Sequence, residues 1–223
     1  MKLTINIPET LNEVTLKQYQ KWLKIADGKE LDSFLQQKMV EIFCNIPLKQ
    51  VLQIKATDIN KTCQELSKLF NTEPKFIDRF TMNNKEFGFI PKLDDISFGE
   101  YVDLDTYLAD WELMNKAIGV LFRPITYKKK KQYLIEDYES ADKYDMTEVT
   151  LDVVFGSLVF FYSLKNELQK TILNYLATQK EIELPQHLRD SLQNGAGINL
   201  STDLLMETFS NTMKLPNQNS TPV

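Results

Sequence analysis

Few side chains in this sequence belong to the types that carry catalysis. The chain has one histidine, His187, and two cysteines, Cys44 and Cys63. A catalytic triad needs a nucleophile and a base held by a third group, and a zinc site needs several ligands at short spacings. None of the three residues lies in such a motif. We therefore expect His187 at the surface and both cysteines as free, buried thiols in a reducing cytoplasm.

A group of carboxylates between positions 94 and 110 is the second candidate for chemistry. Its members are Asp94, Asp95, Glu100, Asp103, Asp105 and Asp110. Paired acids can bind a divalent cation or transfer protons, but the spacing here matches no calcium-loop pattern. Acids also favour helix starts, where they complement the helix dipole. We therefore predict no catalytic site, no metal and no cofactor, and a protein that is not an enzyme.

The run Lys128–Lys131 is the sharpest charge feature, and Tyr127 and Tyr133 flank it. Lysines beside aromatic rings can bind a phosphate backbone and stack on bases. However, the formal net charge is −5 and the isoelectric point is about 5.1, so the whole molecule does not attract nucleic acid. We expect a solvated hairpin tip, and a nucleic-acid-binding module that uses Tyr127, Lys128, Lys129, Lys130, Lys131 and Tyr133 is the alternative.

No segment predicts secretion or membrane insertion. Residues 1–8 contain no apolar stretch of signal-peptide length and predict a short strand that Pro8 ends. The longest apolar run covers about twelve residues, 153–164, whereas a membrane-spanning helix needs about twenty. This run favours a buried helix.

The first part of the chain, residues 1–73, predicts a helical module after its initial strand. Apolar residues recur at helical spacing in 16–26, 33–45 and 57–70, and Pro47 can begin a short helix that ends at 52. Thr15, Asp32 or Ser33, and Thr57 are the candidate N-caps.

Residues 74–184 predict a β-hairpin followed by a helical core. The alternation over 76–90 surrounds Asn83-Asn84, and asparagine tolerates the positive φ of a tight turn. Ser97 and Glu100 have the spacing of a capping box, which predicts a helix from Phe98. A further helical stripe, with Asp110 as its cap, runs from residue 111 and ends at Arg123-Pro124.

Two more elements complete this part. Residues 125–127 and 133–135 predict a second hairpin or a pair of extended arms around the lysines. Residues 150–179 predict one helix or two, and the first half should be the central core helix. There, Gly156 and Ser157 would allow a neighbouring backbone to approach closely.

Residues 185–223 predict a C-terminal arm. Gly195-Ala196-Gly197 is a flexible joint, and a short amphipathic helix follows. Such a helix is unstable alone, so it must dock on its own domain or on a neighbour. Its predicted contact residues are Leu204, Leu205, Phe209 and Met213. The fold class that we predict is α+β and mainly α.

Several phrases carry a family resemblance: LDDISFGEYVDL at 93–104, NKAIGVLFRPI at 115–125, and residues 152–168. Together they resemble an uncharacterised protein family of tailed bacteriophages. Residues 14–20, 46–48 and 66–70 are similar to the opening of tail-assembly-chaperone-like proteins. The resemblance covers about residues 3–180 and rests on packing and capping patterns.

The resemblance implies a non-enzymatic role in phage assembly through protein–protein contact. The chain would be a tail-assembly chaperone or a minor structural subunit of the virion. Its partners would be tail or head–tail proteins, with a homo-oligomer as a further option. Its location would be the host cytoplasm during assembly or the virion. The resemblance brings no functional residues to this sequence.

Overall fold

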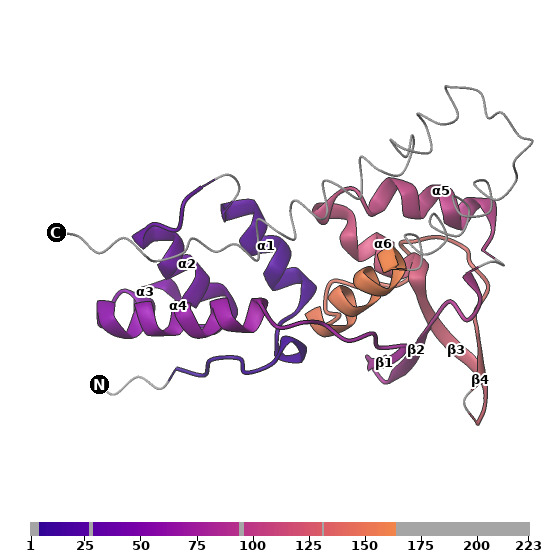
Figure 1. The fold of residues 1–223 in the computed structure, drawn as a ribbon, viewed down its shortest axis with the longest axis horizontal. Coiled ribbons are helices and arrows are strands. Elements are labelled where there is room, and N and C mark those ends of the chain that lie inside the picture. Colours follow the sequence, from indigo (N-terminus) through magenta and orange to yellow (C-terminus); the bar gives the residue numbers. More distant parts are fainter. Residues whose placement is uncertain (1–4, 27–28, 94–95, 131, 164–223) are drawn as a thin grey trace, which may run out of the picture.

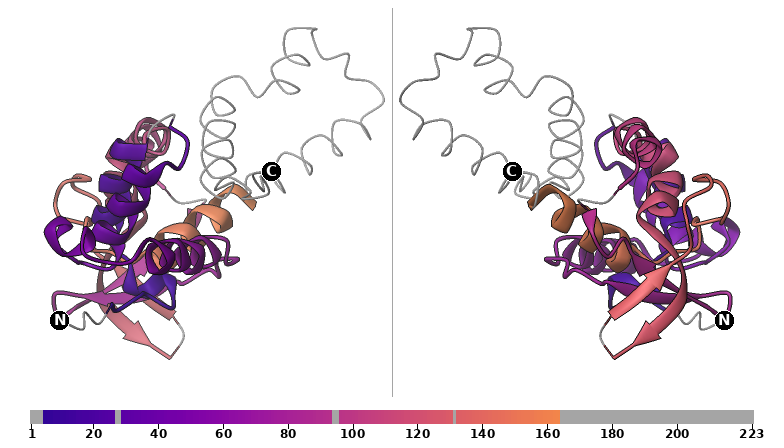
Figure 2. Two further views of the ribbon diagram at one scale, coloured as in Figure 1. Left: turned by 90° about the vertical axis from the view of Figure 1, so that its left-hand side faces the viewer. Right: turned by 90° about the vertical axis from the view of Figure 1, so that its right-hand side faces the viewer.

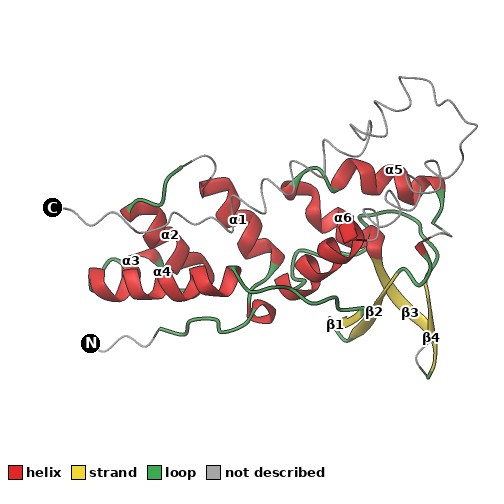
Figure 3. Ribbon diagram, in the orientation of Figure 1, coloured by secondary structure: helices red, strands yellow, loops and turns green. Residues whose placement is uncertain are grey.

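A computed structural model describes residues 5–26, 29–93, 96–130 and 132–163. The fold is α+β and mainly helical, as predicted. Helices α1–α4 occupy one end of the molecule and a four-stranded sheet with α5 and α6 occupies the other (Figure 1; Figure 3). Within the described residues, no helix is long and apolar enough to span a membrane.

The helical end begins with a 3-10 helix, Leu11–Glu13, and continues through the four predicted helices. They are α1 (Leu16–Ala26), α2 (Ser33–Phe43), α3 (Leu48–Val51) and α4 (Ala56–Phe70). Thr15 and Asp32 act as predicted, since each side chain accepts a hydrogen bond from a backbone N–H in the first turn of α1 or α2. Thr57 was the wrong cap for α4, because the N-cap is Lys55, two residues earlier, and the helix begins at Ala56.

The sheet is antiparallel in the order β1-β2-β3-β4. Its strands are β1 (Arg79–Met82), β2 (Lys85–Phe89), β3 (Phe122–Lys129) and β4 (Gln132–Ile135). The predicted turn is confirmed: Asn83 and Asn84 have φ of 50° and 62°. The second hairpin is also confirmed, and Figure 2 shows it projecting away from the helices. β2 pairs with β3, which joins the two hairpins in one sheet.

The helices beside the sheet are α5 (Phe98–Tyr107) and α6 (Met114–Leu121), with a 3-10 helix, Trp111–Leu113, between them. The predicted capping box is present, because Ser97 Oγ accepts from Glu100 N and Glu100 accepts from Ser97 N. Asp110 accepts from Glu112 N at 2.8 Å and so caps the 3-10 helix rather than an α-helix.

Residues 151–163 form a helix between the two ends of the molecule, and its first half, residues 151–158, is largely buried. The prediction for Gly156 is confirmed, since a side chain there would collide with the backbone carbonyl of Lys75. The rest of the predicted helix, 164–179, lies outside the described residues.

One hydrophobic core runs through both ends of the molecule. The ring of Tyr19 on α1 lies 5.9 Å from Phe70, 5.2 Å from Trp111 and 5.3 Å from Phe155, measured between centroids. Thr15 and Thr150 also form an isolated antiparallel bridge. This core includes residues on both sides of the predicted boundary at residue 73.

Two predicted strands were wrong or too long. Residues 5–8 form no strand, because no described segment pairs with them, and residues 1–4 of the predicted strand lie outside the described part of the chain. β1 begins at Arg79 rather than at Phe76, since its ladder begins opposite Gly88. Phe76 instead stacks on Phe160, with ring centroids 4.0 Å apart.

Candidate functional site

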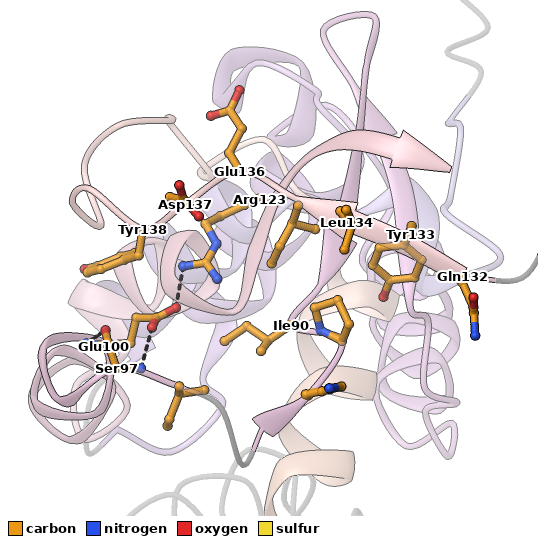
Figure 4. Close-up of a pocket in the computed structure, with 14 residues that line it drawn as sticks. Ile90, Ser97, Glu100, Arg123, Gln132, Tyr133, Leu134, Glu136, Asp137 and Tyr138 are labelled. Atoms are coloured by element: carbon orange, nitrogen blue, oxygen red, sulfur yellow. Dashed lines mark hydrogen bonds and ion pairs between the residues drawn. The ribbon is translucent and has the colours of Figure 1, made fainter. Parts of the chain in front are cut away.

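A pocket of about 840 Å³ lies between the start of α5 and the sheet face that carries Arg123 and Tyr133. Its walls come from residues 90–92 after β2, from Ile96, Ser97 and Glu100, and from residues 132–138 along and beyond β4. Figure 4 shows these side chains around an open centre. The volume is within the range of small-molecule sites.

A buried ion pair between Glu100 and Arg123 lies at this pocket. The capping box fixes Glu100 at the first turn of α5, and the pairing of Gly88 with Arg123 fixes the arginine on β3. Their side chains meet directly, with Arg123 Nη1 donating to Glu100 Oε1 (Figure 4). Glu100 is 5 % exposed and Arg123 is 9 % exposed, so little solvent screens the pair.

Opposing effects act on the Glu100 carboxyl. Burial acts to raise its pKa, but the hydrogen bonds from Ser97 and Arg123 outweigh burial and lower the pKa below its ordinary value of 4.5. Glu100 is therefore ionised at neutral pH. Among the described residues, Arg123 forms an ion pair with Glu100 alone. Its Nε is buried and has no hydrogen-bond partner in this part of the chain.

Two tyrosines shape the walls around this pair. Arg123 lies over the ring of Tyr138, 5.6 Å from the centroid, and Tyr138 donates its hydroxyl hydrogen bond to Asp103. Burial, with the Asp103 contact next, raises the Tyr138 pKa. Tyr133 lies across Gly88 and donates to Phe89 O at 2.8 Å. Burial, with nearby Asp78 second, raises its pKa to about 12.

The acidic cluster does not converge on one point. Asp94 and Asp95 lie outside the described residues. Glu100 pairs with Arg123, Asp103 accepts from Tyr138, and Asp110 caps a 3-10 helix. Asp105 is exposed on α5. Within the described residues, no group of three or more histidine, cysteine, aspartate or glutamate side chains could hold a metal ion.

The lysine run lies at the tip of the β3–β4 hairpin, as predicted. Lys128 forms an ion pair with Glu86 at 2.7 Å, whereas Lys129 and Lys130 are exposed; Lys131 lies outside the described residues. Tyr127 is exposed, but the Tyr133 ring covers Gly88 and is not free to stack on a base. The structure thus presents fewer of these groups to a nucleic acid than the sequence suggested.

Both cysteines are buried and free. Burial raises the pKa of Cys44 to about 11 and that of Cys63 to about 12, so neither thiol is a ready nucleophile. His187 and the predicted arm residues Leu204, Leu205, Phe209 and Met213 lie outside the described residues.

α5 presents an exposed apolar face to solvent. Phe98 is 82 % exposed, and Tyr101 and Val102 are each 43 % exposed. The three positions are three and four residues apart, so they lie on one side of the helix. We call these three residues the α5 apolar face.

Comparison with known proteins gives no family for this chain. No protein-family model, curated protein or solved structure matches it.

Sequence reasoning missed Arg123 as a site residue, because Arg123-Pro124 was interpreted as the end of a helix. α6 does end just before it, at Leu121, but the strand β3 begins at the next residue. One signal was available. A single arginine directly after the apolar run 117–122 has few ways to avoid burial, and a buried arginine needs an anionic partner.

Proposed function

We propose that the chain is a non-enzymatic assembly protein of a tailed bacteriophage and acts by protein–protein contact. It is either a tail-assembly chaperone or a minor structural subunit of the virion. The α5 apolar face is the observation that carries this proposal. The partner is a phage structural protein with an apolar surface that covers this face.

The exposure of the α5 apolar face is unusual for a helix of a globular protein. Leu104 and Leu108 already anchor α5 in the core, so the remaining exposed positions of the helix would normally be polar. Instead, Phe98 leaves most of an aromatic ring in water. Burying such a ring against a partner contributes about 1.5–3 kcal/mol, and aromatic residues of this kind are common at interface centres.

The family resemblance supports the same function independently of the exposure. One of the phrases that carries it, 93–104, includes the first turns of α5 and therefore the α5 apolar face.

The first experiment is quantitative mass spectrometry of purified particles and of infected-cell lysate, for a phage that encodes this chain. A fixed copy number per particle would make it a virion subunit. Abundance in the lysate with absence from particles would make it a chaperone. Normal yields of complete, infectious particles after deletion of its gene would overturn the proposal.

The second experiment tests the α5 apolar face itself. Phe98→Glu should lower particle yield at least tenfold, because a charge replaces the most exposed ring. The fold should persist, since an acid in the first turn favours a helix. Phe34→Glu is the matched control: Phe34 is 50 % exposed in the first turn of α2, at the other end of the molecule. Equal yields from the two variants would exclude the α5 apolar face as the contact.

The predicted arm gives a further contact for the same function. A chain that lacks residues 198–223 should lose its partner complex and still unfold in one cooperative step. Size-exclusion chromatography with the identified partner measures the first, and calorimetry measures the second. Retained binding would remove Leu204, Leu205, Phe209 and Met213 from the proposal.

A further inference from the structure

The ion pair at the pocket leaves the Nε of Arg123 without a hydrogen-bond partner among the described residues. Glu100 takes Nη1, and Arg123 makes no other ion pair with a described residue. Its Nε is also buried. A buried, unpaired N–H is destabilising, and more so in a charged group. Arg123 thus lines a pocket of about 840 Å³ and has an N–H donor that no described residue accepts from.

We infer that this pocket binds a carboxylate group through the guanidinium edge of Arg123 that Glu100 leaves free. The edge formed by Nε and Nη2 presents parallel N–H groups at the spacing of two carboxylate oxygens. Ile90, Ile96 and Ile135 also line the pocket, so they can contact an aliphatic chain attached to that carboxylate. The ligand is a carboxylate with an apolar chain.

Arg123 and Lys92 are the cations that line the pocket, and the carboxylates Glu100, Glu136 and Asp137 outnumber them, which favours a singly charged anion over a phosphate. Glu100 is ionised and in contact with the same guanidinium. The negative charge of Glu136 is neutralised, because Lys143 Nζ lies 3.0 Å from Glu136 Oε2 and the Tyr144 hydroxyl donates to the same oxygen at 2.8 Å. Asp137 is exposed, lines the pocket and makes no ion pair with a described residue. The carboxylates around the pocket repel a doubly charged phosphate about twice as strongly as they repel a singly charged carboxylate ligand.

The carboxylate has two possible sources with the same chemistry. One is a small aliphatic acid, which suits the pocket volume. The other is the C-terminal carboxylate of a peptide. The experiment below distinguishes them. Neither source depends on the proposed assembly function, because the α5 apolar face and the pocket are tested with different variants.

The test is a titration of the full chain with each probe. Binding is monitored through the Nε–H signal of Arg123 in nitrogen-15 NMR. The sequence has arginines at 79, 123 and 189 only, which makes the assignment simple. The probes are sodium hexanoate, its neutral analogue hexanamide, and a short apolar peptide with a free or an amidated C-terminus. We expect hexanoate, the free-acid peptide or both to shift this signal, and neither hexanamide nor the amidated peptide to do so.

Two isosteric variants test the electrostatics without disturbing the ion pair. Asp137→Asn should tighten binding of the responding carboxylate about threefold at low salt, because one repulsive charge is removed. Asp105→Asn is the matched control. Asp105 is an exposed aspartate on α5 that does not line the pocket, so its replacement should leave the affinity unchanged.

A double variant tests Arg123 itself. Glu100→Gln with Arg123→Gln removes both charges together, and a glutamine at position 100 can still complete the capping box. This variant should lose at least tenfold in carboxylate affinity, with helical content unchanged by circular dichroism. Asp137→Asn keeps the inference testable if the double variant does not fold.

The outcomes separate clearly. A response to hexanoate supports a small-molecule ligand, and a response to the free-acid peptide alone supports a protein C-terminus. The inference is overturned if no carboxylate shifts the Arg123 signal, or if the neutral analogues shift it equally. It is also overturned if Asp137→Asn and Asp105→Asn have the same effect.

Discussion

At the scale of single residues, the pair of Glu100 and Arg123 joins α5 to the sheet. Each partner is held by its own element, the carboxylate by a capping box and the guanidinium by its register opposite Gly88. Breaking a buried pair costs about 3–5 kcal/mol, because the remaining charge stays buried. The pair therefore contributes both to the fold and to the chemistry of the pocket.

Glu100 should make the free energy of unfolding depend on pH in the acid range. Its pKa in the folded chain is below 4.5, so its contribution is present above pH 4.5 and is lost as the pH falls through the folded pKa. Glu100→Gln should melt at a lower temperature at neutral pH, and the difference from the wild type should narrow below pH 4.5. Calorimetry over this pH range measures the difference. A difference that does not change with pH would contradict the assignment.

Two glycines should respond in opposite ways to alanine. A methyl group at Gly156 would collide with the carbonyl of Lys75, whereas at Gly99 its nearest neighbour is Ser97 Oγ at 4.0 Å. Gly156→Ala should lower the free energy of unfolding by about 2 kcal/mol or more, despite the better helix propensity of alanine. Gly99→Ala should raise it by about 0.5–1 kcal/mol. Urea denaturation measures both, and a stabilising Gly156→Ala would show that the helix and Lys75 do not touch.

At the scale of elements, local sequence signals fix the turns and caps. Asn83 and Asn84 both have positive φ, as a two-residue turn between antiparallel strands requires. The Ser97–Glu100 capping box begins α5 at the predicted residue. Each signal acts over a few residues, so it works whatever the rest of the chain does.

The first hairpin turn can be tested at this scale. Asn84→Gly should raise the free energy of unfolding by about 0.5 kcal/mol, because glycine adopts positive φ without strain. Asn84→Val should lower it by at least about 1 kcal/mol, because a β-branched residue is strained there. Urea denaturation compares the two variants. Equal effects would mean that the turn changes its type.

At the scale of the whole molecule, one core joins the helical end to the sheet end. Tyr19 contacts rings from α4, from the 3-10 helix before α6 and from the helix at 151–163. The two ends therefore cannot lose their packing separately without exposing this aromatic cluster.

We expect a single cooperative unfolding transition in calorimetry, with equal calorimetric and van't Hoff enthalpies. Tyr19→Ala should destabilise the whole molecule by about 3 kcal/mol or more, because it leaves a cavity where the two ends meet. Two separate transitions in the wild type would contradict a shared core and favour a boundary at residue 73.

The charge distribution gives a further prediction at this scale. The net charge is −5, and Glu86 already neutralises Lys128. Any weak DNA or RNA binding should therefore be unchanged when Lys128–Lys131 are all replaced by glutamine. Gel-shift assays at low and physiological salt measure this. Salt-sensitive binding that this change abolishes would support the nucleic-acid alternative.

The sequence by itself determined the elements whose causes are local. Helical periodicity located α1, α2, α4 and the helix at 151–163, and Asn83-Asn84 located the first turn. It also anticipated the close backbone approach at Gly156, since glycine in an apolar helix has few other uses. These features depend on neighbours along the chain, and that information is present in one sequence.

Only the tertiary structure decided which distant residues meet. Pairing of β2 with β3 turned two hairpins into one sheet, placed Arg123 opposite Gly88 and brought it to Glu100, 23 positions earlier in the chain. It also moved Tyr133 from a predicted stacking residue to the cover of Gly88. Strand pairing of this kind depends on the packing of the whole core, so no local pattern could have specified the pocket.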